Sequence, residues 1–175
     1  MTPTLVFYII IGILIVKFIF DQFLNFQNAK HFDDTLPSEL QGIYDEEEYL
    51  KSQRYKKVNF KFGTITSTFS ICITLLFFFL DGFAYVHNWV SSLTDNTILV
   101  TLYFFGVIFF GSDLLNTPFS YYKTFIIEEE FEFNKSTKKT FLLDKIKGWL
   151  MAIILGGLIL SILTWFYETT TTNFW

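Results

Sequence analysis

The chain has 175 residues, of which 51% are hydrophobic and 21% aromatic, while only 17% are charged, against about 25% in an average soluble protein. This composition excludes an intrinsically disordered chain, and a formal net charge of -4 argues against a nucleic-acid binder. A disulfide framework is also excluded, because Cys72 is the only cysteine. A membrane protein or an unusually apolar soluble protein is left.

Four long apolar stretches predict transmembrane helices. A hydrocarbon core of about 30 Å needs roughly 20 residues of α-helix. Stretches of about this length, with few or no charges, occur at residues 4–24, 62–80, 96–112 and 148–167. A soluble chain of this size would not have enough polar surface to cover four such helices. We therefore expect an all-α, polytopic membrane protein with a single membrane domain over residues 1–175.

The first of these stretches is expected to be a retained helix and not a signal peptide. No Lys or Arg precedes Lys17, and no small-residue cleavage site follows the apolar run. Lys17 and Asp21 lie one helical turn apart near the inner end of this span, so they can pair or extend towards the polar boundary. An ionisable pair within a span is also a candidate functional feature.

The distribution of basic residues predicts the orientation in the membrane. Apart from Lys17, every Lys and Arg lies in one of two long loops, at about residues 25–61 and 114–147, with six in each. Loops that are rich in Lys and Arg stay in the cytoplasm. We therefore expect both long loops inside and the N-terminus outside, in the cell membrane of a bacterium or the endoplasmic reticulum of a eukaryote.

The first loop carries the pattern of a helix that projects from the membrane. Acidic residues at 45–48 precede basic residues at 51–57, and this order complements the helix dipole. Only Gly63 interrupts the run into the second span. The pattern predicts one long helix from about Asp45 to about Leu80, with half of it outside the membrane.

The second loop contains the sequence FIIEEEFEFN at residues 125–134. Acidic and aromatic residues alternate from Glu130 to Phe133, which favours a short extended segment with one apolar face. Ser136 or Thr137 can then cap a helix that continues into the fourth span. The loop is therefore expected to combine one extended segment with a helical extension.

The chain contains no recognisable catalytic or metal-binding motif. It has no HExxH, CxxC, GxSxG or GxxxxGK sequence. The predicted topology places His31 and His87 on opposite sides of the membrane. The carboxylates at residues 128–130 and 132 have no histidine nearby in the sequence, and such clusters more often form a solvated or Lys-paired face than a zinc site. We therefore predict no catalytic residue, no metal ligand and no cofactor within this chain.

Two stretches resemble the cytoplasmic loops of the integral-membrane CAAX prenyl endopeptidases. LPSELQGIYDEEEYLKSQRYKKVNFKFG (residues 36–63) is similar to the first of these loops, and PFSYYKTFIIEEEFEFNKSTKKTFLLDKIKGWL (residues 118–150) to the second. The family pattern of the second loop is approximately P-x-x-x-Y-x-T-F-x-I-E-E-x-x-G-F-N-x-x-T with a later D-x-I-K. The matching residues are Pro118, Tyr122, Thr124, Phe125, Ile127, Glu128, Glu129, Phe133, Asn134, Thr137, Asp144, Ile146 and Lys147. Glu132 replaces the Gly of the pattern and would be strained there if its φ were positive.

The resemblance implies a zinc metalloendopeptidase that cuts near the C-terminus of prenylated CAAX substrates. It places zinc in a catalytic half that follows the fourth span, so zinc is expected in the full-length protein and not in this chain. The chain would then form part of a membrane chamber, and its partners would be the lipid bilayer, the catalytic half and a prenylated or membrane-associated peptide. Contacts with the cleft or with the catalytic half are expected from Glu128, Glu129, Asn134, Thr137, Asp144 and Lys147.

A different class of protein fits the same composition. The chain could be a small, self-contained membrane scaffold or a transporter subunit without enzymatic activity. The hydroxyl side chains of the second span, such as Thr64 and Ser67, could line a path or simply pack against other helices. An HExxH sequence downstream in the reading frame would favour the protease.

Overall fold

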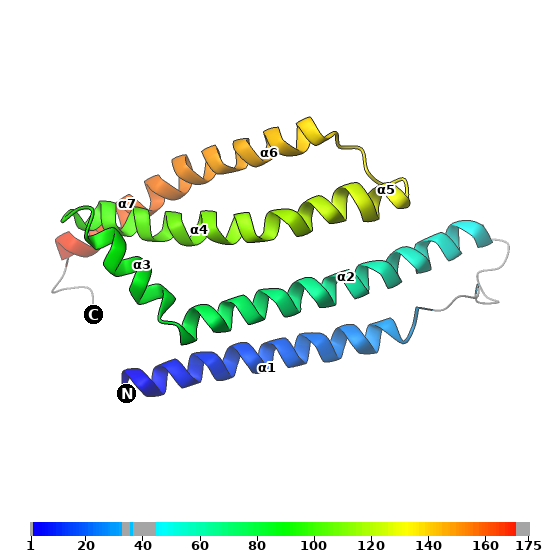
Figure 1. Cartoon of the computed structure of the whole chain (residues 1–175), viewed down its shortest axis with the longest axis horizontal. Helices are drawn as coiled ribbons and strands as arrows, with labels where there is room; N and C mark the ends of the chain where they lie inside the picture. The colour runs from blue at the N-terminus through cyan, green and yellow to red at the C-terminus, as the bar shows by residue number, and fades with distance from the viewer. Residues whose placement is uncertain (1, 33–35, 37–44, 171–175) are drawn as a thin grey trace. The chain divides into compact units, whose positions relative to one another are not determined.

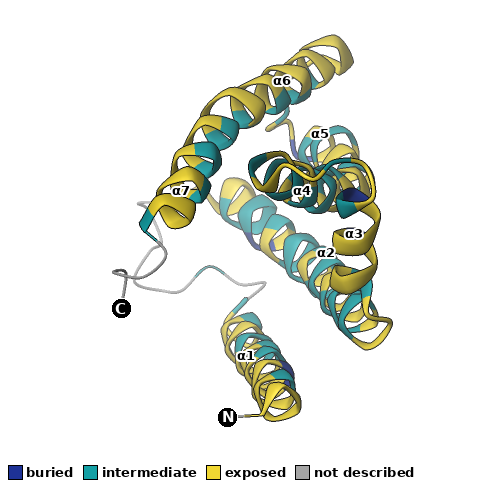
Figure 2. Cartoon of the chain, turned by 90° about the vertical axis from the view of Figure 1, so that its left-hand side faces the viewer, coloured by how far each residue is buried: buried dark blue, intermediate teal, exposed yellow. Residues whose placement is uncertain are grey.

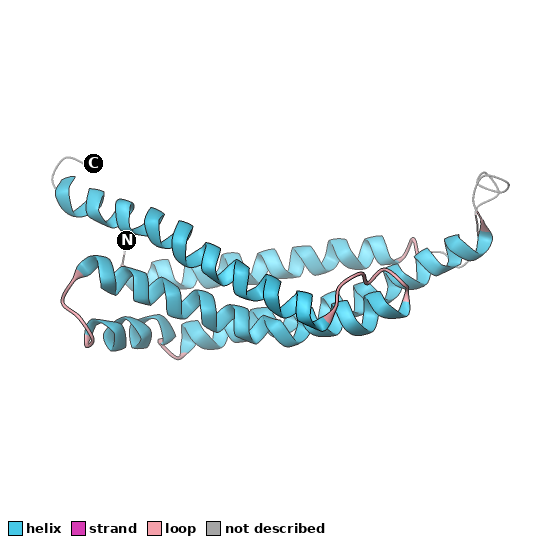
Figure 3. Cartoon of the chain, turned by 90° about the horizontal axis from the view of Figure 1, so that it is seen from above, coloured by secondary structure: helices cyan, strands magenta, loops and turns pink. Residues whose placement is uncertain are grey.

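The computed structural model describes residues 2–32, 36 and 45–170, and within these ranges it contains helices and turns but no strand (Figure 3). Contacts divide the chain into two compact units. The first unit comprises Met1–Leu80 and Phe125–Phe133, and the second comprises Asp81–Thr124 and Asn134–Trp175. The single domain expected from the sequence stays a prediction.

The first unit is built on two antiparallel helices, α1 (Pro3–Ala29) and α2 (Glu46–Phe79), which lie side by side (Figure 1). Three contacts follow one another along this pair: the rings of Phe7 and Phe79 with centroids 5.8 Å apart, the Gln22 amide donating to the Ser67 hydroxyl at 2.9 Å, and the rings of Phe32 and Phe60 at 6.5 Å. Aromatic contacts and a hydrogen bond between side chains therefore join the two helices.

Capping explains where these two helices begin. The Thr2 hydroxyl accepts a hydrogen bond from the Leu5 N–H at 3.3 Å, and Pro3 occupies the first turn, where its missing N–H costs nothing. The Asp45 carboxylate accepts from the N–H groups of Glu47 and Glu48 at 2.9 and 3.1 Å. The helix predicted from about Asp45 to about Leu80 is thereby confirmed.

The second unit consists of a short helix and two long helical segments. Its elements are α3 (Gly82–Ser91), α4 (Thr97–Tyr122), α6 (Lys138–Met151), a π-helical turn η3 (Ala152–Gly156) and α7 (Gly157–Thr170). The rings of Phe110 and Trp149 lie 5.7 Å apart and those of Tyr121 and Phe141 5.9 Å apart, so α4 and α6 run antiparallel. Of the two caps that the sequence allowed, Ser136 and Thr137, the structure has Thr137, whose hydroxyl accepts from the Thr140 N–H at 3.1 Å.

The four predicted spans correspond to four helices that are long and apolar enough to cross a membrane. They cover Pro3–Ala29, Glu46–Phe79, Thr97–Glu130 and Lys138–Thr170, with mean hydropathies between 1.8 and 2.4 over their most apolar windows. Large apolar side chains on these helices are exposed, for example Val16 at 66% and Ile13 at 62%. Figure 2 colours much of the surface of the helices as exposed. Such surfaces suit contact with lipid. Residues 33–35 and 37–44 of the predicted first loop lie outside the described residues.

The prediction of a short extended segment from the alternation at Glu130–Phe133 is wrong. The helix of the third span continues through a π-helical turn, η2 (Lys123–Ile127), into α5 (Glu128–Glu130), and a turn follows at Phe131 and Glu132. The alternation of acidic and aromatic residues has a different cause. Phe131 lies in this turn and Phe133 follows it, and both rings contact the ring of Tyr55. A local pattern cannot distinguish this tertiary relationship from the alternation of a strand.

Candidate functional site

Five side chains of the first unit join α2 to the turn that follows α5, and we call them the α2 clasp. They are Lys51, Tyr55, Phe131, Glu132 and Phe133. The Tyr55 ring makes edge-to-face contacts with Phe131 and Phe133, with centroids 5.2 and 4.9 Å apart. The Lys51 ammonium donates to a Glu132 carboxylate oxygen at 2.5 Å and lies 5.9 Å from the centre of the Phe133 ring. Aromatic, cation–π and ionic contacts thus converge on one turn.

Helix geometry places the two α2 members of the clasp together. Lys51 and Tyr55 are four residues apart and therefore lie on one side of the helix, one turn from each other. Phe131, which contacts Tyr55, is buried with 5% of its surface exposed, and Ile127 one turn before it is buried with 2% exposed. Glu132 lies at the exposed edge, where the hydrogen bond and the positive charge of Lys51 lower the pKa of its carboxyl below the ordinary value. The clasp therefore has an apolar base and an ionic rim.

Glu132 adopts the left-handed backbone conformation, with a φ of 63°. This region favours glycine, because the Cβ of other residues approaches the backbone too closely there. The family pattern has Gly at this position, so the strain expected from the sequence for a positive φ is present. The side chain that causes the strain also supplies the acidic partner of Lys51.

The predicted site residues of the first unit lie on α5. The backbone carbonyl of Glu128 accepts a hydrogen bond from the Phe133 N–H at 2.8 Å, which closes the turn. The Glu128 side chain is half-buried, whereas Glu129 is exposed. The structure therefore places both residues directly beside the α2 clasp in the sequence and in the fold.

The remaining predicted site residues belong to the second unit and serve local contacts there. The Asn134 side-chain oxygen accepts from the Ser136 N–H at 2.7 Å, and Thr137 caps α6. Asp144 and Lys147 form an exposed pair at 3.5 Å along the same helix. Asn134 and Thr137 are thus brought together at the start of α6, while Asp144 and Lys147 lie further along it.

A polar contact inside the second unit was not anticipated from the sequence. The Asp113 carboxylate of α4 accepts from the Lys145 ammonium at 2.7 Å and from the Trp149 indole N–H at 2.9 Å. Lys145 and Trp149 are one turn apart on α6 and reach the same partner. The signal was an acidic residue at the end of an apolar span, but the sequence does not reveal which of several lysines pairs with it.

The described residues do not fit a zinc site. No group of three or more His, Cys, Asp and Glu side chains with metal-binding geometry occurs among them. Structural and catalytic zinc sites need three or four such ligands around the ion. His31 lies just after α1 in the first unit, whereas His87 lies on α3 in the second unit. We therefore derive no catalytic step from these residues.

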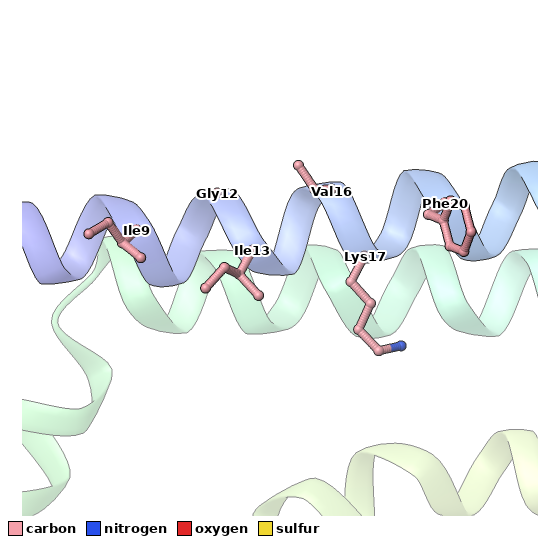
Figure 4. Close-up of a pocket in the computed structure, with 6 residues that line it drawn as sticks. All are labelled: Ile9, Gly12, Ile13, Val16, Lys17 and Phe20. Atoms are coloured by element: carbon pink, nitrogen blue, oxygen red, sulfur yellow. The ribbon is translucent and has the colours of Figure 1, made fainter.

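A shallow groove on α1 offers no reactive group either. It is lined by one helix only, through Ile9, Gly12, Ile13, Val16, Lys17 and Phe20 (Figure 4). The Lys17 ammonium donates to the Asp21 carboxylate at 2.5 Å, so the pairing that the sequence allowed is present. The groove is a face of α1 with one charged lining residue, which lies among apolar side chains.

Comparison with known proteins identifies the family of this chain. Residues 25–175 match the family described as "CAAX prenyl protease N-terminal, five membrane helices". The chain is 32% identical to the probable CAAX prenyl protease 1 of Schizosaccharomyces pombe, over 95% of this chain and 37% of that protein. It is 30% identical to the CAAX prenyl protease 1 homolog of Dictyostelium discoideum, over 97% of this chain and 41% of that protein.

A solved structure gives the same result. The crystal structure of Ste24p from S. mikatae matches 99% of this chain and 42% of its own chain, with a TM-score of 0.88 and 29% sequence identity. The chain is thus an integral membrane protein with several helical spans. It belongs to the CAAX prenyl protease N-terminal family. It spans about two fifths of the length of the relatives that it matches.

Proposed function

We propose that this chain is the N-terminal membrane region of a CAAX-type zinc metalloendopeptidase. In this proposal it forms part of a membrane chamber that supports the proteolysis of prenylated or membrane-associated peptides. The observation that carries the proposal is the match to proteins named CAAX prenyl protease 1 along nearly the whole chain. In this proposal zinc belongs to the catalytic half of the full-length protein, as the similarity to the CAAX prenyl proteases implies.

We propose that this chain contributes by holding one of its own segments in a fixed position. The segment from Glu128 to Thr137 connects the third and fourth spans, and the α2 clasp holds its first half against α2. A segment fixed in this way can present a constant surface to the catalytic half. Contacts with that half or with the cleft are assigned to six residues: Glu128, Glu129, Asn134, Thr137, Asp144 and Lys147.

The proposed orientation follows from the basic residues. Both long loops face the cytoplasm and the N-terminus lies outside, because twelve of the thirteen Lys and Arg residues lie in those loops. The compartment that we propose is the endoplasmic reticulum, since the relatives named above are eukaryotic proteins. The α2 clasp then lies on the cytoplasmic side.

A chimera tests the proposal. The matching N-terminal region of the Saccharomyces cerevisiae CAAX prenyl protease 1, which is 29% identical to this chain, is replaced by residues 1–175. We expect the purified chimera to cleave a prenylated peptide, and a second chimera that carries Tyr55→Ala in the clasp to cleave it more slowly. A folded chimera of parental abundance that cleaves no prenylated peptide would argue against the proposal.

A further inference from the structure

Four exposed basic side chains surround one end of the first unit, and we call them the basic collar. They are Arg54, Lys56 and Lys61 of α2 and Lys30, which follows α1. None of the four forms an ion pair with any residue that the structure describes. The Lys30 ammonium lies over the ring of Phe26, 4.9 Å from its centre.

Other basic residues of the chain differ from the collar because they form ion pairs within the fold. Lys51 pairs with Glu132, and Lys145 pairs with Asp113. These contacts join segments that are distant in the sequence. The collar residues form no such ion pair with the described residues, so ionic contacts within the described part of the chain do not account for their charges.

The collar lies at the level where the helices enter their apolar spans. Lys61 directly precedes the predicted second span, and the contact between Phe32 and Phe60 brings the end of α1, with Lys30, to this level. At 1.5 Å per residue, Arg54 lies about 10 Å further out along α2. The acidic first turn of α2 is roughly 20 Å from Lys61, beyond the screening length of about 8 Å in physiological salt.

We propose that the basic collar binds the headgroups of anionic phospholipids at the membrane boundary. Clusters of Lys and Arg just outside a transmembrane helix are attracted to the negative surface of such a lipid layer. Arg54 and Lys61 are seven residues apart, which puts them on one side of α2, whereas Lys56 lies on the other side. Lys56 is four residues from Phe60, so it lies on the side of α2 that faces the end of α1 and Lys30. The charges therefore point in more than one direction at the membrane boundary.

The test measures which lipids associate with the chain in bilayer nanodiscs. Spin-labelled phosphatidylserine and phosphatidylcholine are the probes, and the motionally restricted fraction of each gives their relative association constants. The collar variant removes three charges through Arg54→Gln, Lys56→Gln and Lys61→Gln. The matched control removes three exposed charges outside the predicted spans through Lys135→Gln, Lys138→Gln and Lys139→Gln. Far-UV circular dichroism verifies that both variants keep their helix content.

The parent chain and the control should prefer phosphatidylserine, and the collar variant should lose most of this preference. The expected loss is up to about fivefold in relative association for each charge removed. If the collar variant does not fold, raising the salt concentration on the parent chain should weaken the same preference, because exposed charges are screened. Equal losses in the two variants, a preference that salt does not change, or no preference at all would overturn the proposal.

Discussion

Lys51 and Glu132 form an ion pair although 81 positions separate them in the sequence. The pair connects the part of α2 outside the predicted span to the turn after the third span. Glu132 makes this contact from a left-handed backbone conformation, with a φ of 63°. The favourable ionic contact and the unfavourable backbone conformation therefore belong to the same residue, and they can be separated by substitution.

The first prediction concerns the backbone of residue 132. Glu132→Ala removes the ion pair and keeps a Cβ in the left-handed conformation, whereas Glu132→Gly removes the ion pair and the strain together. The glycine variant should therefore be more stable than the alanine variant by about 1–2 kcal/mol. Reversible unfolding in a denaturing detergent provides the measurement. An alanine variant as stable as the glycine variant would show that the left-handed conformation is not maintained.

The second prediction concerns pH. Lys51 lowers the pKa of the Glu132 carboxyl below the ordinary 4.5, so the pair contributes fully above that value and is lost as pH falls through the lowered pKa. In the Lys51→Gln variant the pKa of Glu132 should return towards 4.5. The chemical shift of the carboxyl carbon, followed during an acid titration, measures both values. An unchanged titration curve would mean that the two side chains do not interact.

The third prediction tests the aromatic part of the α2 clasp. Tyr55→Ala removes two edge-to-face contacts, each of which is typically worth 0.5–1.5 kcal/mol beyond simple burial, so we expect a destabilisation of about 1–3 kcal/mol. Tyr85, which is 75% exposed, provides the control as Tyr85→Ala and should change the stability little. Equal unfolding midpoints for the two variants would contradict a role of Tyr55 in holding the turn.

The fourth prediction concerns the second unit. Asp113→Asn removes the charge that Lys145 and Trp149 share, and leaves a partly buried ammonium without its counterion. The expected loss is about 1–3 kcal/mol of unfolding free energy. Asp144→Asn is the matched control, because its pair with Lys147 is exposed on both sides, at 62% and 72%, and such pairs contribute little. An equal loss of unfolding free energy in Asp144→Asn and Asp113→Asn would contradict a particular contribution of the contact between α4 and α6.

The local features of this fold could be predicted from the sequence, and the tertiary ones could not. Capping depends on residue type and on the immediate neighbours. The starts of α2 at Asp45 and of α6 at Thr137 could therefore be predicted from the sequence. The segment from Glu130 to Phe133 was interpreted as extended because its alternation has the period of a strand. In the structure Phe131 and Phe133 of this segment both contact Tyr55, which is more than seventy positions away. No local pattern contains that information.

The same limit applies to the candidate site. The resemblance identified Glu128 and Asn134, but the residues that position their segment, Lys51 and Tyr55, lie in an ordinary basic stretch of the first loop. Asp113 directly follows the predicted third span, at residues 96–112. Its partners on α6 could not be chosen from the sequence, because several lysines of the second loop were equally suitable.

The fifth prediction measures the proposed role of this segment in the complete protein. Glu128→Gln and Asn134→Ala should lower the rate of cleavage of a prenylated peptide several-fold, because each removes a polar group that we assign to contacts with the catalytic half. Glu130→Gln, at an exposed position of α5, is the control and should cleave at nearly the parental rate. Parental rates in all three variants would reduce the segment to a connection between spans.

The most direct test of the account compares the complete protein encoded by the same reading frame with the 175-residue chain. Both are purified and reconstituted into the same lipid, and the cleavage of a prenylated CAAX peptide is measured with and without a zinc chelator. We predict chelator-sensitive cleavage by the complete protein and none by the chain alone. A complete protein that cleaves no prenylated peptide, or a chain that cleaves it without further sequence, would contradict the assignment of this chain as the membrane region of a protease.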